Sequence, residues 1–145
     1  MIPWILAAML QLQPAAPWLA TYHETARGII EGAEAEPVFA GDVRRTIALD
    51  IAVAWFESRF QQDAVGDHGA AHGLYQVHAP LAATVKQQTI AANRMMRESM
   101  RACRALPLEH RLALYASGSC DRGRKQSTWR MRLAERLFRA AGGEA

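Results

Sequence analysis

The chain has 145 residues, of which 50% are hydrophobic and 21% are charged, so a single core can bury most of its apolar surface. Its 10 glycines and 6 prolines exclude a collagen, a low-complexity polymer and a largely disordered chain. The 17 Lys and Arg residues against 14 Asp and Glu residues leave a net charge of +3. This charge admits nucleic acid, anionic lipid or a bacterial wall as a partner and selects none of them.

The first 16 residues fit two interpretations. Residues 2–12 are about as long as the apolar core of a signal peptide, and residues 13–16 resemble a small-residue cleavage region. However, no Lys or Arg precedes Arg27, and Pro17 would directly follow the cut. We therefore favour a packed segment over a cleaved leader, and assign residues 17–145 to the domain itself. No apolar run reaches the roughly 18 to 20 residues of a spanning helix, so we expect no transmembrane segment.

Helical periodicity dominates the first half of the chain. It predicts one helix over residues 21–34 and a second that begins after an Asp42 N-cap and runs to Glu57. The second helix is apolar on nearly all sides, so it must lie in the centre of the core. The Asp- and Gly-rich residues 63–73 predict a loop, and the alternation over residues 74–77 predicts a short strand after it.

Three more helices are expected in the second half. Pro80 opens a long helix, Pro107 opens another that Gly118 ends, and Ser127 caps the last. On this last helix, one side carries the apolar residues Trp129, Leu133 and Leu137, and elsewhere around it lie Arg130, Arg132, Arg136 and Arg139. No repeat or long linker divides the chain, so we predict one mainly α domain with a small loop or β insert.

Two cysteines, Cys103 and Cys120, make up the whole thiol content. Their wide spacing is not a CxxC redox or zinc pattern, and an even count in a small exported protein permits one disulfide. We favour this bridge over two reduced thiols, and expect it to stabilise the fold by about 3 kcal/mol.

The sharpest candidate for chemistry is Glu57, which ends the apolar helix directly after Trp55 and Phe56. A carboxyl group against apolar side chains loses solvation of its charged form, and the helix C-terminus adds partial negative charge. We therefore expect Glu57 to retain a proton near neutral pH, as a general acid must. By position alone, exposure to solvent or a pair with Arg59 is the simpler alternative.

Two motifs around this residue resemble a known family. The first comprises residues 57–60 (Glu-Ser-Arg-Phe), 64–66 (Ala-Val-Gly) and 73–77 (Gly-Leu-Tyr-Gln-Val), and the second is residues 114–118 (Leu-Tyr-Ala-Ser-Gly). Together they resemble the signature of lytic murein transglycosylases and goose-type lysozymes, over about half of the chain. The resemblance implies a lysozyme-like α+β fold and an enzyme that needs no cofactor. It also implies that Glu57 is the catalytic acid/base.

By this resemblance, the substrate is the peptidoglycan glycan strand. Glu57 would protonate the glycosidic oxygen between N-acetylmuramic acid and N-acetylglucosamine, and then take the proton of the sugar's 6-hydroxyl to close a 1,6-anhydro ring. This route needs one carboxylate, whereas ordinary glycosidases use two. If Asp63 or Asp67 held a water opposite Glu57, lysozyme-type hydrolysis would result instead.

The substrate-binding set that the resemblance implies is Ser58, Gly73, Leu74, Tyr75, Gln76 and Tyr115. Gly73 permits close backbone approach to a sugar, Gln76 offers a donor and an acceptor, and both tyrosines offer flat faces. Core packing for Leu74, bracing of the loop by Gln76 and support of Glu57 by the Tyr115 hydroxyl are the alternatives.

The sequence also departs from the family pattern. Tyr75 replaces the usual methionine, Ser117 and its neighbours replace Asn-Ala, and the loop before Gly73 is one residue longer. These departures leave the acid in place and bear on the sugar contacts.

Histidines and arginines suggest other functions. His68, His72 and His78 lie near the predicted site, but their spacing across a glycine-rich loop is not typical of a metal site, and we expect none. The C-terminal part is basic, with Arg122, Arg124, Lys125, Arg130, Arg132, Arg136 and Arg139.

The basic C-terminal part admits a non-catalytic helical protein that binds DNA, or a phage or envelope structural component. We favour a solvated helix face and expect no nucleic-acid partner. The prediction is a monomeric peptidoglycan-cleaving enzyme that is periplasmic, secreted or phage-associated.

Overall fold

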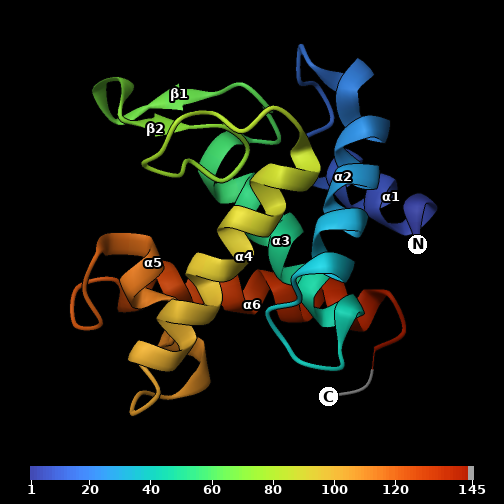
Figure 1. Cartoon of the computed structure of the whole chain (residues 1–145). Coiled ribbons are helices and arrows are strands. Elements are labelled where there is room, and N and C mark those ends of the chain that lie inside the picture. The colour runs from blue at the N-terminus through green and yellow to red at the C-terminus, as the bar shows by residue number, and fades with distance from the viewer. Residues whose placement is uncertain (144–145) are drawn as a thin grey trace.

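The computed structural model describes residues 1–143, which form six α-helices and one two-stranded antiparallel sheet (Figure 1). The α-helices are α1 (Ile2–Leu12), α2 (Tyr22–Ala35), α3 (Val43–Ser58), α4 (Val85–Ala102), α5 (Ala113–Ser117) and α6 (Arg124–Ala140). The strands are β1 (Val65–Gly66) and β2 (Ala71–His72), and the 3-10 helices are η1 (Leu19–Thr21), η2 (Asp67–Gly69) and η3 (Leu108–His110). The predicted mainly α chain with a small β insert is confirmed.

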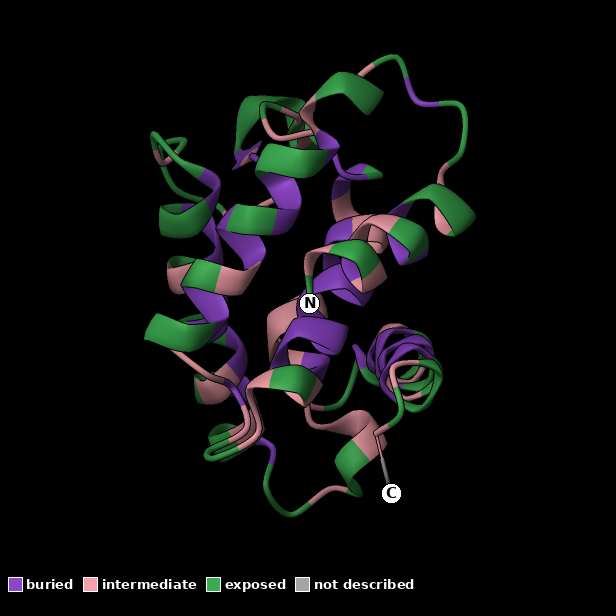
Figure 2. Ribbon diagram, turned by 90° about the vertical axis from the view of Figure 1, so that its right-hand side faces the viewer, coloured by how far each residue is buried: buried purple, intermediate pink, exposed green. Residues whose placement is uncertain are grey.

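The helix α3 lies in the centre, as its all-round apolar sequence predicts. Every residue from Thr46 to Ala54 is buried, and α1, α2 and α6 all pack against the helix. Its predicted N-cap is confirmed, because Asp42 Oδ1 accepts a hydrogen bond from the Arg45 backbone N–H at 2.9 Å. The left-handed Arg59, with φ of 54°, ends α3 just after Glu57 and Ser58. Figure 2 shows the buried residues on the inward sides of the helices.

Close packing of α2 on α4 fixes the position of α4. A Cβ atom at Gly28 would lie 2.6 Å from Val85 Cγ1, and one at Gly32 would lie 2.7 Å from Thr89 Cγ2. The two glycines therefore let the helices approach more closely than side chains would allow.

The helix α1 packs on the domain through Ile5, Ala8 and Met9, which are buried. Its C-terminal end is held by two hydrogen bonds: Trp55 Nε1 donates to the Leu12 carbonyl at 3.1 Å, and the Tyr22 hydroxyl donates to the Gln13 carbonyl at 2.9 Å. This segment is packed on the domain in the uncleaved chain, and cleavage of a leader stays the alternative to that interpretation. None of the helices in residues 1–143 combines the length and apolar character that crossing a bilayer requires.

The strand predicted over residues 74–77 is wrong. The sheet pairs Val65 with His72 and Gly66 with Ala71, and residues 74–77 form turns with a single bridge between His72 and Val77. Gln76 adopts φ of 48° in this turn, and its side-chain amide donates to the Gly73 carbonyl at 3.0 Å. Local hydrogen bonds to the glycine turn thus override the alternating pattern.

Two predicted helix starts are also wrong. The helix α4 begins at Val85 and not at Pro80, because the Thr84 hydroxyl caps it by accepting from the Gln87 N–H at 3.2 Å. Ser127 lies inside α6, where its buried hydroxyl donates to the Glu109 carbonyl at 2.7 Å. From the sequence alone, a buried serine that links two segments cannot be distinguished from a serine that caps a helix.

The segment after Pro107 contains η3 followed by α5 and is not one continuous helix. Gly118 ends α5 with φ of 72°, as predicted. The predicted disulfide between Cys103 and Cys120 is confirmed, with the Cα atoms 5.6 Å apart. It joins the end of α4 to the chain just after α5 and so closes the loop that carries Tyr115.

Candidate active site

A cavity of about 580 Å³ opens between the end of α3, the loop after β1 and helix α5. In Figure 1 the sheet lies on one side of this region and α5 on the other. Both sequence motifs contribute to its lining, which consists of Glu57, Asp67, Ala71, Tyr75, Gln76, Val77, His78, Met95, Leu114, Tyr115, Ala116, Ser117 and Gly118. The fold therefore brings the two distant motifs to one cavity, with a volume in the usual range for ligand sites.

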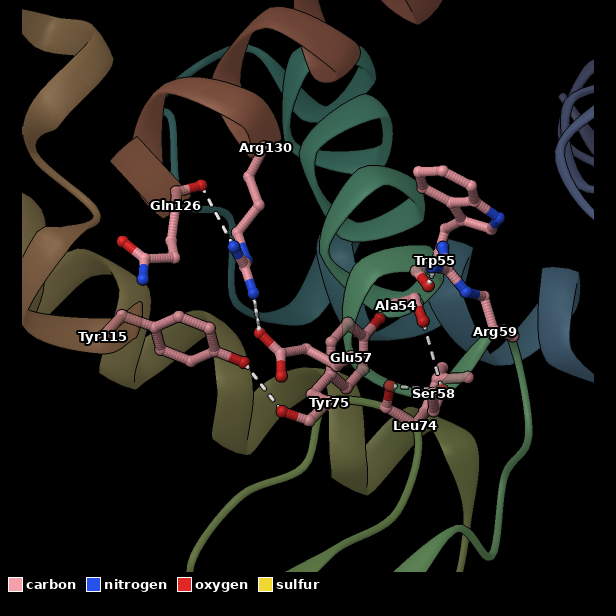
Figure 3. A network of polar contacts seen from close by, with 10 residues as sticks. All are labelled: Ala54, Trp55, Glu57, Ser58, Arg59, Leu74, Tyr75, Tyr115, Gln126 and Arg130. Atoms are coloured by element: carbon pink, nitrogen blue, oxygen red, sulfur yellow. Dashed lines mark hydrogen bonds and ion pairs between the residues drawn. The ribbon is translucent and has the colours of Figure 1, made fainter. Parts of the chain in front are cut away.

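Glu57 is paired with an arginine from α6. Arg130 Nη2 donates to Glu57 Oε1 at 2.6 Å and its Nε donates to the same oxygen at 3.2 Å (Figure 3). The Glu57 side chain is 19% exposed and that of Arg130 is 9% exposed. The guanidinium is fixed further by a bond from Nη1 to the Gln126 carbonyl at 3.0 Å, and by the Phe56 ring 5.1 Å away.

The contact with Arg130 differs from both sequence expectations. Glu57 is neither surrounded by apolar groups alone nor paired with Arg59, whose guanidinium stacks on Trp55 at 4.1 Å. The carboxyl group of Glu57 therefore lies against a positive charge as well as against apolar side chains. The contact uses only Oε1, and no hydrogen bond within residues 1–143 joins Oε2 to another group.

Two tyrosines lie beside Glu57 and tie α5 to the loop. The Tyr115 hydroxyl donates to the Tyr75 carbonyl at 3.0 Å, and the Tyr75 hydroxyl is 3.0 Å from Thr89 Oγ1. Burial raises the pKa of Tyr115 well above its ordinary value, and the nearby Glu57 carboxylate raises it further. Burial likewise raises the pKa of Tyr75. Both hydroxyls therefore keep their protons and act as hydrogen-bonding groups.

Ser58 and Leu74 brace the site from behind. The Ser58 hydroxyl lies 2.7 Å from the Leu74 carbonyl and 3.1 Å from the Ala54 carbonyl, so it links α3 to the loop. Leu74 is fully buried, and its backbone N–H donates to Gln88 Oε1 at 2.7 Å. Neither residue lines the cavity.

Gly73 and Gln76 shape the loop in different ways. Gly73 has φ of 79° and faces Gln88 and Leu81, where a Cβ atom would lie 2.6 Å from Gln88 Oε1. It therefore lies outside the cavity lining, whereas Gln76 is part of it. The Gln76 amide nitrogen is bound to the Ala64 and Gly73 carbonyls, at 3.1 and 3.0 Å.

The acidic and histidine side chains of the loop separate into two groups. Asp67 and His78 line the cavity and contact each other, with His78 Nε2 2.9 Å from Asp67 Oδ2. Asp63 lies outside the lining and accepts a bond from Gln61. Within residues 1–143, no three His, Cys, Asp or Glu side chains come together in a way that could hold a metal ion.

Sequence reasoning missed Arg130, which it placed among the arginines away from the apolar side of α6. Arg130 is buried, and it lies three and seven residues before Leu133 and Leu137, which are also buried. This spacing places it on the inward face of the helix. The position of Arg130 on the apolar face of α6 is therefore the feature of the sequence that could have predicted a buried arginine with an acidic partner.

A second hollow, of about 540 Å³, lies on the outer side of α6. Its lining is Phe56, Trp129, Arg132, Glu135, Arg136 and Arg139, and the Phe56 and Trp129 rings stack with their centroids 6.5 Å apart. The carboxylate in it, Glu135, contacts Arg139 at 3.0 Å and Arg45 at 3.5 Å. Because Glu135 is paired with two arginines, this hollow offers no free carboxyl group as an acid and suits an anionic ligand.

Neither a protein-family model, nor a curated protein, nor a solved structure matches this chain. The relation to lytic transglycosylases and goose-type lysozymes therefore remains a resemblance, carried by the two motifs that meet at the cavity.

Proposed function

We propose that the protein cleaves the glycan strands of peptidoglycan between N-acetylmuramic acid and N-acetylglucosamine, with Glu57 as the acid/base. The observation that carries this proposal is the position of Glu57. Its carboxyl group comes from the end of the central helix into a cavity that Tyr75, Gln76 and Tyr115 also line. Both motifs that resemble the lytic transglycosylase signature contribute to that lining.

The chemistry requires Glu57 to act twice. A proton on Oε2 passes to the glycosidic oxygen as the bond between that oxygen and C1 of the muramic acid breaks. The 6-hydroxyl oxygen of the same sugar then bonds to C1, and its proton returns to the Glu57 carboxylate. The product is a 1,6-anhydromuramyl end, and the enzyme recovers its original protonation state.

Arg130 supports this cycle by stabilising the charge that develops on Glu57. As the proton leaves, the carboxylate becomes negative beside a guanidinium that is already fixed by Gln126 and Phe56. A preorganised charge of this kind lowers the energy of the state in which charge appears.

The Tyr115 ring and the Gln76 side chain are the proposed sugar contacts. Tyr115 is half-buried and offers aromatic surface at the cavity, whereas the Tyr75 ring is buried and only the edge of this residue reaches the lining. The nitrogen of the Gln76 side-chain amide makes two hydrogen bonds, and its oxygen makes none within residues 1–143. The loop that carries these groups is held in place from behind the cavity by Ser58, Gly73 and Leu74.

The decisive experiment is the Glu57→Gln variant assayed on purified cell walls. We expect the release of soluble fragments to fall by about 10²- to 10⁴-fold, because glutamine keeps the size of the side chain and cannot transfer the proton. The matched control is Glu34→Gln, at an exposed position on α2. A circular dichroism melt verifies that both variants fold, and undiminished release by folded Glu57→Gln would refute the proposal.

The disulfide favours action outside the cytoplasm, since such bonds persist in oxidising compartments. We propose a periplasmic, secreted or phage-associated protein that acts as a monomer on the wall. A direct measurement is the oxidation state of Cys103 and Cys120 in protein recovered from each compartment of the producing cell.

The hollow on α6 favours a second candidate, a non-catalytic basic protein that binds nucleic acid. Trp129 is 47% exposed there beside Arg132 and Arg136. Titration of a fluorescent duplex at 50 and 200 mM salt tests it, because phosphate contacts make affinity fall steeply with salt. Weak binding that salt does not change would dismiss this candidate.

A further inference from the structure

The cavity contains a second pair of ionisable side chains, on the side formed by the loop. His78 Nε2 lies 2.9 Å from Asp67 Oδ2, and both residues line the same cavity as Glu57. Their side chains are 63% and 57% exposed, so the pair is open to water. An exposed pair of this kind contributes little to stability, and its position at the cavity calls for another explanation.

The loop that carries the pair is held in a sparsely populated conformation. Asp67 has φ of 51° and Gln76 has φ of 48°, both in the left-handed region that residues other than glycine rarely adopt. The surrounding contacts impose these angles: β1 pairs with β2, His72 bridges to Val77, and the Gln76 amide is bound to two carbonyls. Residues held in this way frequently serve a site, and here they place Asp67 next to His78.

The contact involves one nitrogen of the imidazole. Asp67 Oδ2 lies 2.9 Å from Nε2, so Nδ1 is the ring nitrogen that Asp67 does not engage. A carboxylate that orients a histidine and leaves its other nitrogen free is the arrangement used for proton abstraction. The remaining ionisable side chains of the lining are Glu57, Tyr75 and Tyr115, and burial keeps both tyrosines protonated.

We propose that His78, oriented by Asp67, is a general base that activates water, so that part of the cleavage is hydrolysis. This inference rests on the proposed function. Glu57 gives its proton to the glycosidic oxygen, the bond from that oxygen to C1 breaks, and the oxygen of water bonds to C1. His78 Nδ1 takes a proton from that water. The imidazolium proton then returns to the Glu57 carboxylate through solvent, and the product is a reducing end.

The hypothesis differs from the two-carboxylate alternative of the sequence. Asp63 is outside the cavity, and Asp67 faces His78, so neither carboxylate is the group that we expect to hold the water. Asp67 is a positioning residue, and His78 is the base. The ratio of reducing to anhydro ends therefore reports on His78 in a way that simple loss of loop structure does not.

The experiment digests purified peptidoglycan in H₂¹⁸O and counts both kinds of muramyl end by mass spectrometry. Wild-type protein should give both, with ¹⁸O only at the reducing ends. In His78→Gln the ratio of reducing to anhydro ends should fall at least about tenfold, and in Asp67→Asn by a smaller factor. The control is His68→Asn, an exposed histidine of the same loop with φ of 54°, where asparagine tolerates the backbone.

A second measurement uses azide, a nucleophile that needs no base. Added to His78→Ala, azide should attack C1 and give glycosyl azide ends in place of the lost reducing ends. A ratio unchanged in His78→Gln, or anhydro ends alone from the wild type, would overturn the role of His78 and leave the proposed function standing. Absence of any cleavage by the wild type would overturn the proposed function, and this inference with it.

Discussion

Each side of the cavity holds one pair of ionisable side chains, and the two pairs lie in opposite environments. The helical side consists of Glu57 on α3 and Arg130 on α6, with side chains 19% and 9% exposed and a shortest separation of 2.6 Å. The loop side carries Asp67 and His78, 2.9 Å apart, with more than half of each side chain exposed. One pair joins two core helices, and the other joins two positions of a single loop.

Because of this difference, the stability of the fold should depend more on the helical pair than on the loop pair. Removing one member of a buried pair leaves a charge without water or partner, which is costly. Breaking a solvated pair costs little, because water replaces the lost contact. We therefore expect stability measurements to distinguish the helical side from the loop side, whereas product analysis should depend on both.

The largest effect on stability is expected for Arg130→Gln. This change leaves the mostly buried Glu57 carboxylate unpaired and also removes the guanidinium from Phe56, so unfolding in urea should become easier by about 3 kcal/mol. The exposed pair provides the contrast, since Asp67→Asn should change the free energy of unfolding by less than about 0.5 kcal/mol.

The matched control on the same helix is Arg136→Gln, at an exposed position. It should change the unfolding free energy little. Equal losses for the Arg130 and Asp67 variants would contradict the comparison between the two sides.

A smaller effect is expected for Gln88→Ala, which acts beneath the loop side. Gln88 Oε1 accepts from the buried Leu74 N–H, and its Nε2 donates to the Gln62 carbonyl at 3.1 Å. Losing this acceptor leaves a buried donor unsatisfied, at about 2 kcal/mol. Amide exchange at Leu74 should quicken, whereas exposed Gln87→Ala should leave it unchanged. Unaltered exchange in Gln88→Ala would show that the loop is held by other contacts.

The last prediction concerns pH and the interior of α3. Burial raises the pKa of Asp50 well above its ordinary value of 3.8, against a smaller opposing effect of the hydrogen bond from Asn93. The unfolded chain therefore loses this proton first, so the contribution of Asp50 to stability is full below about pH 4 and is lost as pH rises through the folded pKa.

Asp50→Asn removes this dependence, and its new amide can donate to Asn93 Oδ1, which has no partner within residues 1–143. We expect the variant to gain stability relative to the wild type as pH increases from 4 toward neutral. Urea titrations at several pH values measure the difference. A constant offset between the two proteins would mean that Asp50 titrates normally.

Local patterns predicted the elements whose determinants lie close together in sequence. The Asp42 cap, the all-round apolar run of α3 and the Gly118 terminus each act within one or two helical turns, and each is confirmed. The disulfide followed from counting cysteines, because a chain with two thiols has one pairing.

The features that escaped prediction depend on distant residues. Arg130 meets Glu57 across 73 positions, and Ser127 binds carbonyl and amide groups of a different segment. Residues 74–77 have the alternation of a strand, yet Gln88 and Ser58 capture the backbone groups of Leu74 that a neighbouring strand would need. Tertiary structure decides which of several possible partners each backbone group binds, and a local sequence pattern carries no information about it.

The hydrogen bond from the Tyr115 hydroxyl to the Tyr75 carbonyl opposes separation of α5 from the loop that contains Tyr75. It fastens α5 to the loop beside the buried Tyr75 ring, so parting them there would strip a donor and an acceptor of their partners. At the outer rim, Asp67 and His78 are more than half exposed, so separating the two segments there leaves no buried group without a partner. A long polymer would then enter sideways over that rim, without any need to thread its end.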